Sequence, residues 1–150
     1  MSKRYVVRHG LMRHLGEFAS KTSMEYQRGN IVIVRSSRGT EWGEVLCDAS
    51  DRTRDYLGQR DGSGKILRPA TPEDERTRDA VHQKEQDAFA GCQEVIRQQN
   101  LAMQLVDAER LFGGERLIFY YLSETRIDFR ELVKLLAERQ SYIEQAGTIK

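Results

Sequence analysis

The chain has 150 residues, of which 39% are hydrophobic and 31% are charged, with only two prolines. This composition is too apolar for a disordered chain and too charged for a membrane protein, so it predicts a soluble globular protein. The N-terminus lacks the apolar stretch and cleavage site of a signal peptide, and no run approaches the ~20 apolar residues of a membrane span. We therefore expect a cytoplasmic protein.

Charge is distributed unevenly along the chain. Residues 1–69 contain 13 basic and 8 acidic residues, a net charge of +5, whereas residues 70–150 contain 11 basic and 15 acidic residues, a net charge of −4. A basic N-terminal half favours nucleic acid or an acidic partner, but it is also compatible with an ordinary solvated surface.

The first half of the chain shows short strand patterns. Strands are predicted at residues 5–8, 17–19, 31–34 and 44–47, where β-branched runs are bounded by Gly, Ser and Asn. The polar stretch 48–64 is predicted to be an exposed loop, and residues 65–68 a final strand. A small β-rich module such as an open barrel would bury these strands.

The second half begins with a helix signal. Thr71 can cap free amides, Pro72 suits the first helical position, and acids favour the positive end of the helix dipole. The helix is predicted from Glu73 to about Gln99. Its apolar stripe recurs at spacings of three, four and seven and consists of Val81, Ala88, Phe89, Cys92, Val95 and Ile96.

A hairpin and a second helix follow. Gly113-Gly114 separates strands predicted at 105–112 and 115–122, and the second strand lacks polar alternation, which predicts a central strand buried on both faces. A helix is predicted to start near Asp128, whose side chain can cap it, and Glu131 at the third helical position would complete a capping box. Its core face would consist of Phe129, Leu132, Val133, Leu136 and Ala137. The prediction is an α+β fold with a β-rich module at 1–69 and a helix–hairpin–helix module at 70–150.

Local signatures of catalysis are missing from the sequence, including the nucleophile elbow, the P-loop and the zinc-protease motif. His9 and His14 resemble a metal pair, but Arg8 and Arg13 would repel a cation, so solvated loop histidines are the favoured interpretation. Cys47 and Cys92 are expected to be reduced, buried thiols. We expect no catalytic residue, no metal and no cofactor.

The segment 38–45, Arg-Gly-Thr-Glu-Trp-Gly-Glu-Val, is the densest unusual stretch. Its two glycines permit unusual backbone angles or a close approach, and the lone tryptophan lies between them. Two interpretations stay open: a tight hairpin whose Trp42 covers one end of the barrel, or a binding loop.

This segment resembles the signature of the polymerase-suppressor C-terminal-domain family, which includes the bacterial YaaT-like and RicT-like proteins. Further blocks at 105–109, 117–121 and 126–134 resemble that family in the same order, and together the matches span about residues 5 to 138. The resemblance implies a cytoplasmic regulatory protein without known catalytic residues. It also implies action in complexes that influence phosphorelay signalling, sporulation, competence or messenger-RNA processing.

One departure from the family concerns the C-terminal end. Longer relatives continue into a cysteine-rich tail linked to an iron–sulfur cluster, whereas residues 139–150 contain no cysteine. The cluster ligands therefore have no counterpart in this sequence, which is expected to be either a short variant or a truncated version.

The leading hypothesis is an adaptor or regulatory subunit that binds protein partners, in an oligomeric state that the sequence does not predict. The alternative is a nucleic-acid-binding module whose arginines contact phosphates, and an unrecognised enzyme is a third reading. The candidate binding residues are Arg38, Glu41, Trp42 and Glu44 in the signature segment, and Arg4, Arg8, Arg13 and Arg28 as phosphate contacts.

Overall fold

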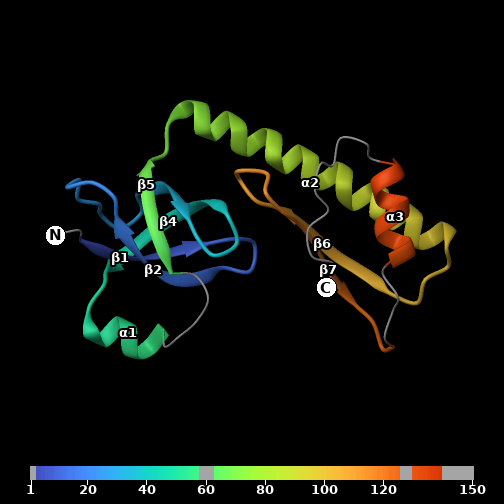
Figure 1. Ribbon diagram of the computed structural model, residues 1–150, viewed down its shortest axis with the longest axis horizontal. Coiled ribbons are helices and arrows are strands. Elements are labelled where there is room, and N and C mark those ends of the chain that lie inside the picture. Colours follow the sequence, from blue (N-terminus) through green and yellow to red (C-terminus); the bar gives the residue numbers. More distant parts are fainter. Residues whose placement is uncertain (1–2, 58–62, 126–129, 140–150) are drawn as a thin grey trace. The chain divides into compact units, whose positions relative to one another are not determined.

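The fold is described from a computed structural model, which places residues 3–57, 63–125 and 130–139 (Figure 1). The chain divides into two compact units. The barrel unit consists of Met1–Arg78 and Leu111–Gly113, and the hairpin unit consists of Asp79–Arg110 and Gly114–Lys150. The predicted α+β class is confirmed, because strands dominate the N-terminal part and helices pack on a hairpin in the C-terminal part. The division into domains at residue 69 stays a prediction.

Five strands of the barrel unit form a closed barrel in the order β1-β2-β5-β3-β4. The strands are β1 (Arg4–His9), β2 (His14–Ser20), β3 (Ile31–Arg35), β4 (Thr40–Asp48) and β5 (Gly64–Pro69). Closure depends on two pairings between strands distant in sequence: β1 with β4, antiparallel, and β2 with β5, parallel. The strands expected from the sequence are therefore present, and the barrel that was expected to be open is closed.

Alternation along the strands places one row of side chains inside the barrel. The strand residues of this core are Tyr5, Val7, Phe18, Val32, Val34, Val45 and Ile66, and Tyr26 joins them from the connection between β2 and β3. The Tyr5 hydroxyl accepts a hydrogen bond from the Tyr26 amide at 3.0 Å, so the buried phenol is satisfied. Gly64 begins β5 at a very close approach: a Cβ there would lie 1.9 Å from the Arg35 carbonyl oxygen. Only glycine fits this crossing.

The stretch predicted to be a loop contains a helix, α1 (Asp51–Leu57), so that part of the prediction is wrong. Ser50 caps it: the Thr53 amide donates to Ser50 Oγ at 3.3 Å, and the Ser50 amide donates to Thr53 Oγ1 at 2.8 Å. No residue of α1 is buried, so the helix leaves no apolar stripe in the sequence. Its formation depends on capping, which periodicity does not detect.

The long helix α2 (Pro72–Gln98) begins as predicted. The Thr71 amide donates to Asp74 Oδ2 at 2.9 Å, and the Asp74 amide donates to Thr71 Oγ1 at 3.2 Å, which completes a capping box. Residues up to Arg78 belong to the barrel unit and the remainder to the hairpin unit.

In the hairpin unit, β6 (Gln104–Arg110) and β7 (Leu117–Leu122) form the predicted hairpin, and Gly114 adopts a φ of 79° in the turn. The hairpin and α2 share a core with α3 (Arg130–Arg139). Its buried members are Ala88, Cys92, Val95, Ile96, Leu105, Ala108, Leu117, Phe119, Leu132 and Leu136. The apolar stripe of α2 is therefore confirmed for four of its six residues, with Val81 and Phe89 half-buried.

Two further expectations fail or fall outside the described residues. Among the described residues β7 belongs to a two-stranded sheet, so it is not central, and Leu122 is 66% exposed. Leu132 and Leu136 are buried on α3 as predicted, and Val133 is half-buried. Asp128, Phe129 and the side chain of Ala137 lie outside the described residues. Within the described part of the chain, no helix is both long and apolar enough to cross a membrane.

Candidate functional site

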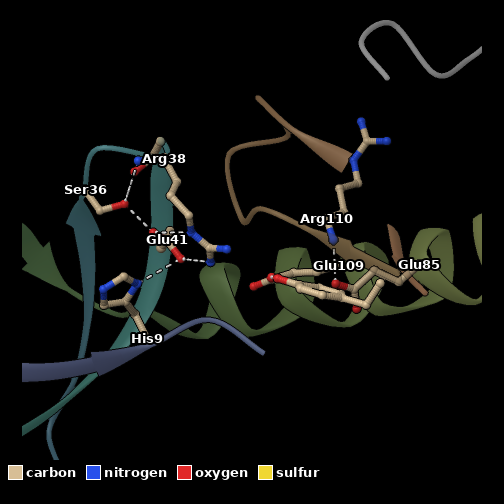
Figure 2. A network of polar contacts seen from close by, with 9 residues as sticks. His9, Ser36, Arg38, Glu41, Glu85, Glu109 and Arg110 are labelled. Carbon is tan, nitrogen blue, oxygen red and sulfur yellow. Dashed lines mark hydrogen bonds and ion pairs between the residues drawn. The ribbon is translucent and has the colours of Figure 1, made fainter. Parts of the chain in front are cut away.

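One end of the barrel interior is closed by polar side chains. Beyond the apolar core, the inward row continues into Glu41, which is 2% exposed, and His9, which is 3% exposed. The Arg38 guanidinium donates to Glu41 Oε1 at 2.6 Å and the Ser36 hydroxyl donates to Oε2. His9 Nδ1 lies 3.0 Å from Oε1, off the line of an ideal hydrogen bond (Figure 2). We call these four residues the polar plug.

The polar plug holds Glu41 as a carboxylate. Burial by itself raises the pKa of Glu41, but contacts from His9, Arg38 and Ser36 outweigh burial and lower that pKa to about 2. The positive charge of Arg38 cancels the negative charge of Glu41. The plug therefore closes the barrel without leaving an unpaired buried carboxylate, which would be costly.

The signature segment 38–45 is mostly strand rather than loop, because β4 begins at Thr40. Gly39 has a φ of 148°, and its carbonyl accepts the Ser36 amide at 2.9 Å in the turn before the strand. A Cβ on Gly43 would lie 2.7 Å from Cγ1 of Val7, so a larger residue would displace the core. The segment thus contributes Gly39 to the turn and Arg38 and Glu41 to the polar plug, and it places Gly43 closely against Val7 of β1.

Trp42 packs within the barrel unit. Its ring centroid lies 6.1 Å from that of Phe112, and the Arg78 guanidinium carbon lies 4.7 Å over the ring. The Gly113 amide donates to the Thr40 carbonyl at 3.1 Å beside this contact. The half-buried indole is therefore held by an aromatic and a cationic neighbour on a strand. The tight hairpin expected here is present, because β3 pairs with β4 through the turn at residues 36–39, and the binding role of Trp42 stays a prediction.

The candidate phosphate contacts are largely paired inside the unit. Arg4 and Arg54 both donate to Glu17, and they lower its pKa although burial raises it. Arg8 donates to Glu44 at 2.6 Å, on the outer surface of the barrel, where the two are cross-strand partners.

The other two candidate phosphate contacts, Arg28 and Arg13, are exposed. The Arg28 guanidinium donates to the Leu46 carbonyl at 3.3 Å. Arg13 is exposed in the turn between β1 and β2, with a φ of 54°. The structure therefore does not gather the four predicted phosphate contacts into one patch, since Arg4 begins β1 and Arg13 lies in the turn after its other end.

Two expectations about reactive side chains are wrong. His9 and His14 are strand residues rather than solvated loop residues, and His9 is buried because it faces the barrel interior. Cys47 is exposed because it lies on β4 beyond the last core residue, Val45. Cys92 is buried as expected, and burial raises the pKa of its thiol to about 12.

The hairpin unit contains a second polar network that no sequence motif predicted (Figure 2). The Arg110 amide donates to Glu85 Oε2 at 2.7 Å, and the Tyr120 hydroxyl donates to Glu109 Oε1 at 2.7 Å. Burial raises the pKa of Glu85, and the nearby charge of Glu109 adds to the effect. The residues come from α2, β6 and β7, so only the tertiary fold brings them together. Within the described residues, no three or more His, Cys, Asp or Glu side chains are arranged to hold a metal ion.

The fold and site define an α+β protein whose closed barrel ends in a buried, charge-balanced plug. Residues 64–142 match the family described as the PSP1 C-terminal conserved region. The chain is 35% identical over 114 residues to the stage 0 sporulation protein YaaT of Bacillus subtilis, covering 74% of this chain and 40% of YaaT. The chain belongs to this family.

A second relative is an uncharacterized protein of Schizosaccharomyces pombe, 42% identical over 73 residues, which covers 47% of this chain and 9% of that protein. The chain thus spans less than half the length of either relative. No solved structure matches the chain.

Proposed function

We propose that this chain is a non-catalytic regulatory or adaptor protein of the cytoplasm that acts by binding protein partners. The name of the Bacillus relative associates that protein with sporulation, which supports a regulatory role. The observation that carries the proposal is the charge pairing on the barrel. Three outward arginines of the barrel unit pair with carboxylates: Arg4 and Arg54 with Glu17, and Arg8 with Glu44 at 2.6 Å.

Charge pairing separates this proposal from the nucleic-acid alternative. A phosphate contact requires a cation that can release counterions, and an arginine bound to a carboxylate must first break that pair. A protein surface of mixed charge instead presents both signs to a complementary partner, which gives specificity of association. The half-exposed pair Arg8–Glu44 has the character expected at the rim of a protein interface.

A charge reversal of this pair tests the proposal. The double variant Arg8→Glu/Glu44→Arg keeps the internal ion pair and its stability but inverts the pattern that a partner would read. The matched control is Glu94→Arg/Arg97→Glu, which inverts an ion pair on α2. Each tagged full-length chain is used for affinity capture from its own cells with nuclease treatment, and the bound proteins are identified by mass spectrometry.

We expect the wild type and the control to capture the same proteins after nuclease treatment, and the reversed variant to lose them. Loss of all captured proteins on nuclease treatment would favour the nucleic-acid alternative. In that case, the logarithm of the binding constant for single-stranded RNA should fall linearly with the logarithm of the salt concentration. The slope should be about −0.7 for each phosphate contact. If the reversed variant captures the same proteins as the wild type, the surface around Arg8 and Glu44 is not where those partners bind.

A further inference from the structure

His9 and His14 face each other across the first hairpin. They are Cα partners in the antiparallel pairing of β1 with β2, so their side chains lie on the same face of the sheet. That face is the barrel interior, because Val7 and Phe18 on the same rows belong to the barrel core. The two ring centroids lie 5.6 Å apart. Two imidazoles thus stand together at the end of the barrel.

The ring of His9 is oriented by the polar plug. Its Nδ1 faces Glu41 on β4, and its Nε2 is buried with no hydrogen-bond partner. The His9 ring lies against β2, because its centroid is 5.6 Å from that of His14 and 5.3 Å from that of Phe18, and both residues belong to β2. Figure 2 shows Nε2 of this ring pointing away from Glu41. A buried nitrogen without a partner is rare and calls for an explanation.

We propose that His9 Nε2 and His14 together bind one late divalent transition-metal ion, such as Zn²⁺, with water completing the coordination. Two imidazoles on one tetrahedral ion, each about 2.1 Å from it, have ring centroids about 5 Å apart, close to the observed separation. Imidazole ligands suit Zn²⁺, Ni²⁺ and Cu²⁺ but not Mg²⁺. Glu41 at Nδ1 provides the carboxylate that fixes a metal-binding histidine in its ligating tautomer.

Arg8 and Arg13, which flank the two histidines in the sequence, do not repel a cation at this site. Arg8 faces the outside of the barrel, whereas the histidines face the inside, and its charge is neutralised by Glu44 at 2.6 Å. Arg13 lies in the exposed turn, where solvent screens its charge. With only two protein ligands, the site is expected to exchange its ion readily.

Calorimetric titration of the full-length, metal-free chain with Zn²⁺ tests the proposal, with Mg²⁺ as the hard-cation control. All proteins carry Cys47→Ser, because the exposed thiol would compete for Zn²⁺. His14→Ala is the principal variant, since His14 is only half-buried and the barrel should tolerate its loss. His82→Ala is the matched control, because His82 is exposed on α2 beside Glu85.

We expect one Zn²⁺ per chain, no heat with Mg²⁺, unchanged binding in His82→Ala and at least tenfold weaker binding in His14→Ala. Glu41→Gln should weaken binding by about 10- to 100-fold, as expected for a carboxylate behind a ligand. Zn²⁺ should also shift the ring ¹⁵N resonances of two histidines, a readout that survives if one variant fails to fold. Absence of saturable binding, equal binding by His14→Ala, or loss of binding in His82→Ala would each overturn the proposal.

Discussion

The start of α2 offers a stability test whose pH dependence can be worked out in advance. The Asp74 carboxylate accepts hydrogen bonds from Arg68 Nη2 at 2.9 Å and from the Thr71 amide at 2.9 Å. The Arg68 guanidinium holds the pKa of Asp74 well below its usual value of 3.8. The lowered pKa means that the ionised form stabilises the fold, fully above pH 3.8 and progressively less as pH falls below it.

Asp74→Asn removes this charge while keeping the shape of the side chain. Because Arg68 is about half exposed, its ion pair contributes only about 0.5–1 kcal/mol, and the charge at the helix N-terminus adds about 0.5 kcal/mol. We expect a loss of roughly 1–1.5 kcal/mol near neutral pH. The loss should shrink towards zero well below pH 3.8, where the wild-type carboxyl is also neutral.

Urea unfolding followed by the fluorescence of Trp42 measures this loss, because the lone tryptophan lies in the same unit as Asp74. Glu75→Gln is the control: Glu75 is an exposed acid in the same first turn, and its replacement should cost only a few tenths of that amount. An equal loss at neutral and acidic pH, or no loss at either, would show that the ionised Asp74 carboxylate does not stabilise the fold.

Three further predictions concern packing and reactivity. Gly64→Ala should lower the midpoint of thermal unfolding by circular dichroism and cost at least about 2 kcal/mol, since its methyl group would meet the Arg35 carbonyl at 1.9 Å. A thiol reagent at neutral pH should label Cys47 in the native chain and Cys92 only on unfolding, because Cys92 is buried with a pKa of about 12. Leu132→Ala should destabilise the hairpin unit by about 2–5 kcal/mol, because Leu132 is 1% exposed and its loss leaves a cavity. Native-state hydrogen exchange of the amides in that unit measures the loss.

The elements that the sequence predicted well carry strong local signals. Thr71 to Asp74 marked the start of α2, and Gly113-Gly114 marked the hairpin, because capping and turn chemistry act between near neighbours. Helix α1 was missed because its seven residues bury nothing and carry no periodicity. The central position expected of β7 failed because a continuous apolar run does not reveal how many strands pair with it.

The candidate site could be located but not interpreted from sequence. The segment around Trp42 has an unusual composition, but its roles depend on partners from other strands, such as Val7 beside Gly43. The burial of His9 depends on the closing of β1 against β4, a pairing of residues some forty positions apart. Long-range pairing of this kind leaves no local pattern, so a loop histidine was the natural prediction.

The order in which the barrel can assemble follows from the place of β5. The last strand of the barrel along the chain inserts between β2 and β3, so both of those edges stay open until β5 has been synthesised. During that interval a growing chain on the ribosome pairs β3 (Ile31–Arg35) with β4 on one edge only, and the other edge is open as a template for association with other chains. Fragments that end before Gly64 should therefore aggregate, and newly made chains should depend on chaperones until β5 emerges.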